Sequence, residues 1–234
     1  MHFLHQKEKM NMKLRTISIW ALALAGGLQS CQTKESKQDD TNSDAVATVV
    51  STDVEPDQSF ENALVYFAQE KYDSSANSVE HAASFMEQMS NSLPEKRDEA
   101  IDSCVADLRD LATSIATDHV YGIGELNYYF GKTGRALAGY TMTITDEKFT
   151  SLTPKEAGLF FQAAIDKMEK SARYHQRELS IEESGLLERA KNMRDRLEKG
   201  EAIDKAETLK MISELRAQLD KWELEFKAKH DAQK

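Results

Sequence analysis

The chain has 234 residues, of which 40% are hydrophobic and 30% charged, with only ten glycines and three prolines. These values are typical of one globular domain with a short addition, and they exclude collagen, low-complexity proteins and polytopic membrane proteins. Two cysteines are too few for a disulfide framework or a four-thiolate zinc site. A net charge of −10 argues against nucleic acid as a partner, because such binding depends on neutralising phosphates with Lys and Arg.

The N-terminal segment carries the features of an export signal. Lys13 and Arg15 precede an apolar run over residues 17–25, and small residues follow it. A basic start, an apolar centre and a small-residue end are the three parts of a signal peptide. The run is shorter than the roughly 20 residues that span a bilayer, so it is predicted to direct export and not to anchor the chain.

Residues 28–31, with the sequence Leu-Gln-Ser-Cys, resemble the lipobox of bacterial lipoproteins. The resemblance implies that residues 1–30 are removed and that Cys31 is lipidated on its thiol and acylated, for example with palmitate, on its new amino group. Several acyl chains on one residue give stable membrane anchoring. An envelope location is implied, with the outer membrane favoured because no aspartate follows Cys31. The start at Met1 or Met12 and the face of the membrane stay open.

Residues 31–57 are predicted to be the lipidated cysteine and a flexible polar tether. This stretch is rich in Lys, Asp, Gln, Ser and Thr and lacks a helical apolar stripe. A random coil of this length reaches about 25 to 30 Å, which would hold the following body close to the lipid.

Acidic residues exceed basic ones mainly between residues 41 and 125. Such an excess keeps an exported protein soluble and repels anionic lipid. Weak binding of a basic partner or of divalent cations is the alternative interpretation.

Residues 58–229 are predicted to form an all-α, multi-helix bundle of about seven helices. Apolar side chains recur three and four positions apart, which places them on one face of each helix. Thr153, Ser180 and Asp204 each precede a glutamate by three residues, the pattern of a capping box at a helix start. The apolar stripes cover residues 60–67, 76–93, 101–115, 126–144, 157–172, 186–197 and 212–226.

Residues 180–229 are predicted to form a long antiparallel αα-hairpin with coiled-coil character. Gly200 ends one helix and Asp204 begins the next, so the turn is short. The apolar positions of the last helix follow heptad spacing, which is typical of a packing seam. As a candidate surface for a protein partner or self-association we identify Ile212, Leu215, Leu219, Trp222 and Phe226.

No motif predicts catalysis, a metal or a cofactor. Gly131-Lys-Thr lacks the earlier glycine and the strand of a phosphate loop. Cys104 lies on an apolar stripe without a nearby base, which predicts a buried, inert thiol. Residues 60–93 loosely resemble one tetratricopeptide unit, although at least three units are needed for a stable stack.

Together these features predict a non-enzymatic, lipid-anchored envelope protein that acts as an interaction or scaffold module through its helical surfaces. The alternative is a receptor that binds a small molecule or a metal in a pocket between helices. Tyr140, Tyr174 and His175 could line such a pocket, because their aromatic bodies carry polar tips.

Overall fold

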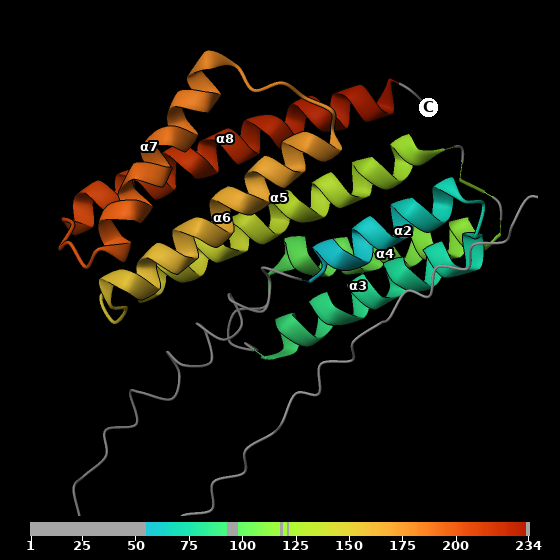
Figure 1. Ribbon diagram of the computed structural model, residues 1–234, viewed down its shortest axis with the longest axis horizontal. Helices are drawn as coiled ribbons and strands as arrows, with labels where there is room; N and C mark the ends of the chain where they lie inside the picture. The colour runs from blue at the N-terminus through green and yellow to red at the C-terminus, as the bar shows by residue number, and fades with distance from the viewer. Residues whose placement is uncertain (1–54, 93–97, 118, 121, 233–234) are drawn as a thin grey trace, which may run out of the picture. The chain divides into compact units, whose positions relative to one another are not determined.

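The computed structural model describes residues 55–92, 98–117, 119–120 and 122–232 (Figure 1). This part of the chain is all-α, as predicted, and it contains seven helices and no strand. The helices are α2 (Asp57–Ala68), α3 (Tyr72–Ser92), α4 (Glu99–Ala116), α5 (Ile123–Lys148), α6 (Pro154–Tyr174), α7 (Ile181–Glu198) and α8 (Lys205–Asp231). Cys31, the signal peptide and nearly all of the predicted tether lie outside the described residues.

The predicted helix starts are confirmed by the hydrogen bonds at the caps. Thr153 and Ser180 each form a complete capping box with the glutamate three residues later. Asp204 caps α8 by accepting from the amide of Ala206, without the capping box expected from Glu207. Asp98, which was not among the predicted caps, caps α4 by accepting from the amide of Ala100. Local side-chain chemistry therefore sets where these four helices begin.

Asp57 is the first residue of α2. Its carboxylate is buried and forms ion pairs with Lys167, at 2.6 Å, and with Lys170, both on α6. Lys167 is itself only 1% exposed. A buried charge is tolerated only when it is paired in this way, so the pair secures the first turn of α2 against α6.

Helices α5 and α6 lie between two sets of helices (Figure 1). On one side, α2, α3 and α4 bury an aromatic cluster in which Phe60 stacks on Phe130 at 4.2 Å between ring centroids and meets the edge of Tyr174. On the other side, α7 packs mainly on α6, and α8 packs mainly on α5. Both cores therefore share the two central helices.

The terminal hairpin is antiparallel, as predicted. Its register is visible in polar contacts between α7 and α8, which pair Arg196 with Glu207 and, further along, Arg189 with Glu214. Gly200 has a φ of +79° in the connecting turn, a conformation that glycine adopts without a Cβ clash.

The expected partner surface on this hairpin is corrected by the packing. The five seam residues are at most 7% exposed, because α5, α6 and α7 cover them. They belong to the protein's own core and are not available to a partner in the folded chain. These residues are Ile212, Leu215, Leu219, Trp222 and Phe226.

Within the described residues, no helix combines the length and the apolar character needed to cross a bilayer.

Candidate functional site

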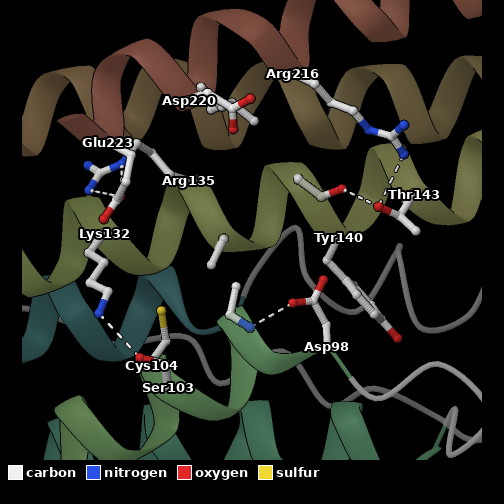
Figure 2. Close-up of a pocket in the computed structure, with 14 residues that line it drawn as sticks. Asp98, Ser103, Cys104, Lys132, Arg135, Tyr140, Thr143, Arg216, Asp220 and Glu223 are labelled. Atoms are coloured by element: carbon white, nitrogen blue, oxygen red, sulfur yellow. Dashed lines mark hydrogen bonds and ion pairs between the residues drawn. The ribbon is translucent and has the colours of Figure 1, made fainter. Parts of the chain in front are cut away.

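A well-defined hollow in the described part of the chain lies where α4 and α8 both pack on α5 (Figure 2). It has a volume of about 530 Å³, and we call it the α5 pocket. Pockets that hold small molecules in proteins commonly measure about 300 to 1,000 Å³. The α5 pocket is therefore large enough for a small organic ligand.

One face of α5 forms the base of the pocket. Its members recur three and four positions apart, so they form a continuous strip along the helix. This strip is distinct from the apolar stripe of α5 that contains Leu126, Phe130 and Leu137. The strip combines long charged side chains with small residues: Lys132, Arg135, Ala136, Gly139, Tyr140 and Thr143.

The two walls come from helices that are distant in sequence. The wall on α8 has the same periodicity and consists of Arg216, Leu219, Asp220 and Glu223. The opposite wall is the start of α4, with Asp98, Ala100, Ser103 and Cys104. The pocket thus depends on the placement of three helices and not on any local motif.

Each cation at the pocket is paired with a carboxylate. Lys132 Nζ lies 2.5 Å from Asp107, and Arg216 lies 3.2 Å from Asp146. Arg135 is only 4% exposed and donates through Nε and an η nitrogen to one oxygen of Glu223, at 3.0 and 2.7 Å. These ion pairs fix the conformations of the charged side chains. Little further conformational entropy is therefore lost when a ligand binds.

His175 forms a hydrogen bond with Arg135. Its Nε2 lies 2.7 Å from an η nitrogen of Arg135, and its ring stacks on Phe226 at 3.7 Å between centroids. Burial, followed by the positive charge of Arg135, lowers the pKa of His175 to about 3. The imidazole is therefore neutral at physiological pH, and Nε2 accepts a hydrogen bond from the guanidinium.

This lowered pKa predicts a loss of stability in mild acid. Between pH 3 and 6.5 the unfolded chain binds a proton at His175 that the folded chain does not. The contribution of neutral His175 to the free energy of unfolding is therefore fully present above about pH 6.5 and decreases as the pH falls. We expect a slope of up to about 1.4 kcal/mol per pH unit from this residue. Denaturant unfolding between pH 7 and 4.5 measures the slope, and a His175→Gln variant should lose most of it. An equal slope in both proteins would contradict the assignment.

The three aromatic residues expected to share a pocket are separated in the structure. Tyr140 lines the α5 pocket, whereas Tyr174 and His175 line a smaller cavity of about 140 Å³ between the ends of α5, α6 and α8. The expectation of a single pocket is therefore corrected. The Tyr140 hydroxyl is buried and has no hydrogen-bond partner among the described residues, and burial raises the pKa of Tyr140 to about 12.

Cys104 also borders the α5 pocket but is not suited to nucleophilic chemistry. It is 1% exposed and has no disulfide partner among the described residues. Burial raises the pKa of its thiol to about 12, so it stays protonated. The prediction of a buried thiol is confirmed.

Sequence reasoning did not identify the pocket residues Arg135, Arg216, Asp220 and Glu223. A signal was nevertheless present, because α5 carries a second strip with helical periodicity in which charged and small residues alternate. A surface helix normally has one apolar face and a polar face opposite to it. On α5 the second strip contains glycine and alanine beside charged residues, and this mixture indicates a hollow at that face.

The described residues contain no group of three or more His, Cys, Asp or Glu side chains that could hold a metal ion. The architecture and the pocket thus define an all-α protein with a polar pocket across its central helix. No protein-family model, no curated protein and no solved structure matches the chain.

Proposed function

We propose that this protein is a lipid-anchored, non-enzymatic binding protein of the bacterial cell envelope, which holds a small molecule in the α5 pocket. The observation that carries the proposal is the pocket of about 530 Å³ with paired charged side chains on its base and walls. A ligand site of this kind needs a few polar groups in preset positions around a partly apolar hollow. The α5 pocket meets both requirements.

The sequence is compatible with a scaffold module and with a receptor, and the pocket favours the receptor. The scaffold function depends in part on an accessible apolar face of α8, and that face is buried within the protein. Large exposed apolar side chains are scattered over several helices, as with Val65 on α2, Ile181 on α7 and Leu224 on α8. Single apolar residues at a surface are normal and do not indicate a partner.

Gly139 provides a direct test of the pocket. A Cβ atom added there would meet no described atom within 4 Å outside the helix's own backbone and the two neighbouring residues, so a methyl group fits, and a larger side chain at this position would occupy the pocket that Gly139 lines. We expect the full-length protein, purified from membranes in mild detergent, to carry a retained non-lipid mass in its native mass spectrum. Gly139→Phe should abolish that mass while the far-UV circular dichroism stays helical, and Gly139→Ala should preserve it. A retained mass that is indifferent to Gly139→Phe would exclude the α5 pocket as the site.

The membrane anchor is proposed from the lipobox resemblance of residues 28–31. Cys31→Ser removes the only acceptor for the thioether-linked lipid, so the variant should lose incorporation of labelled palmitate and leave the membrane fraction. Cys104→Ser serves as the control and should keep both properties. Membrane retention of Cys31→Ser would contradict the anchor without affecting the pocket.

A further inference from the structure

A smaller cavity lies where the start of α5 meets the ends of α6 and α8 (Figure 1). We call it the His175 cavity. Two stacked ring pairs border it: Tyr128 lies on His230 at 3.6 Å between centroids, and His175 lies on Phe226. Its volume of about 140 Å³ is below that of pockets for drug-sized molecules, so a ligand there can have only a few heavy atoms.

The orientation of His175 leaves one N–H group of the ring without a partner. Nε2 accepts from Arg135, whose guanidinium is always protonated, so the neutral ring carries its proton on Nδ1. Phe226 covers one face of the ring, and the edge with Nε2 and Cδ2 faces Gly131 on α5. Nδ1 lies on the opposite side of the ring and forms no hydrogen bond with a described residue. A half-buried donor of this kind requires an acceptor from water or a ligand.

Three further side chains at the cavity can donate hydrogen bonds and have no side-chain partner among the described residues. They come from three different segments: Asn127 from α5, Gln176 from the turn after α6, and Lys229 from α8. No aspartate or glutamate belongs to the described lining, although the whole chain has a net charge of −10. The cavity therefore combines several donors with one ammonium group and no carboxylate.

The charges that surround the His175 ring are positive. Burial lowers the pKa of His175, and the neighbouring groups that lower it further are Arg135, Lys229, His230 and Arg177. Such groups disfavour any additional positive charge and favour a negative one. The electrostatics of the cavity thus agree with its donor chemistry.

We propose that the His175 cavity is a binding site for a small oxyanion of the size of phosphate or sulfate. The ammonium of Lys229 and the Nδ1–H of His175 donate to its oxygens, and the side-chain amides of Asn127 and Gln176 complete the shell. Charged acceptors form stronger and shorter hydrogen bonds with such donors than neutral acceptors do. Arg135 and Phe226 hold the imidazole in its orientation before the anion binds. The site is separate from the α5 pocket and does not depend on the function proposed for that pocket.

Calorimetric titration of the full-length protein in detergent at neutral pH tests the site, with inorganic phosphate as the probe. We expect saturable binding of one phosphate per chain, and we expect sulfate to compete with it. Sodium chloride at equal ionic strength is the control for general screening and should give no saturable heat.

Asn127→Asp places a carboxylate in the cavity without changing the size of the side chain. We expect this variant to abolish phosphate binding by repulsion, and it should keep its helicity because an acidic residue is favourable near a helix N-terminus. Asn77→Asp is the matched control, since Asn77 is exposed on α3, and it should bind phosphate like the wild type.

Lys229→Met removes the ammonium group and should weaken phosphate binding about tenfold, the value expected for one charge-assisted hydrogen bond. Lys227→Met removes the same charge from an exposed position of α8 that does not line the cavity, and it should bind like the wild type. Circular dichroism verifies that each variant is folded.

Three results would each overturn the inference. The first is the absence of phosphate and sulfate binding to the wild type, and the second is unchanged binding by a folded Asn127→Asp variant. The third is equal weakening by Lys227→Met and Lys229→Met, which would indicate attraction to a positive surface and not to a defined site. None of these results concerns the retained mass at the α5 pocket, which Gly139→Phe tests separately.

Discussion

Replacing Glu183 with alanine is expected to lower the free energy of unfolding by about 3 kcal/mol or more, because a buried hydrogen-bonded charge leaves its partners unpaired when it is removed. Glu183 is 2% exposed. One of its oxygens accepts from Trp222 Nε1 at 2.8 Å, from Gln218 at 3.0 Å and from Arg177 at 2.5 Å. The other closes the capping box of α7 by accepting from the amide of Ser180 at 2.8 Å.

The electrostatics of Glu183 agree with this structural role. Burial alone would raise its pKa, but hydrogen bonds from Trp222 and the amide of Ser180, followed by Arg177, lower it to about 2. Since the folded pKa lies below the unfolded value of about 4.3, the charge stabilises the fold above that pH, and this contribution is lost as the pH falls toward 2.

Denaturant unfolding followed by circular dichroism measures the effect of Glu183→Ala. Glu183→Gln keeps the size and part of the accepting capacity, so its loss should lie between those of the wild type and the alanine variant. Glu182→Ala is the matched control, because Glu182 is exposed in the same turn and should change stability by less than about 0.5 kcal/mol. A loss below about 1 kcal/mol for Glu183→Ala would show that the network does not stabilise the hairpin.

Two glycines on α5 should respond to alanine in opposite directions. A Cβ atom at Gly131 would lie 2.4 Å from Nε2 and 2.6 Å from Cδ2 of His175. His175 cannot easily move, because it is stacked on Phe226 and bonded to Arg135. We therefore expect Gly131→Ala to destabilise the protein by about 2 kcal/mol, as overpacking of a filled core does.

Gly139→Ala is the counterpart on the same helix. The new methyl group enters open space, so the higher helix propensity of alanine should stabilise the protein by about 1 kcal/mol. Urea titrations of the two variants should therefore differ by about 3 kcal/mol in the free energy of unfolding. Similar values for both would mean that His175 yields to the added methyl group and does not constrain α5.

Adding Gly131→Ala to a His175→Ala background supplies an internal check. If the clash with the imidazole causes the loss, the alanine at position 131 should become neutral or stabilising in that background, because the obstructing ring is gone.

The helices themselves could be predicted because the interactions that form them are local. The capping oxygens of Thr153 and Ser180 bond to amides three residues away, and the apolar stripes repeat within one or two turns. The antiparallel hairpin also followed from a short turn at Gly200. Such features involve only neighbouring residues, so the amino-acid sequence by itself determined the all-α class and the helix starts.

Only the tertiary structure decided what each helix face does. The heptad seam with Leu215 and Trp222 could have met a partner, but α5 and α6 present complementary faces and bury it. Glu183 was visible as a capping residue, yet its burial depends on Trp222, which is 39 residues away. The α5 pocket likewise joins Arg135 to Glu223 across 88 residues. Helical periodicity defines which residues share a face, whereas the crossing of distant helices determines whether that face is a core, a surface or a pocket.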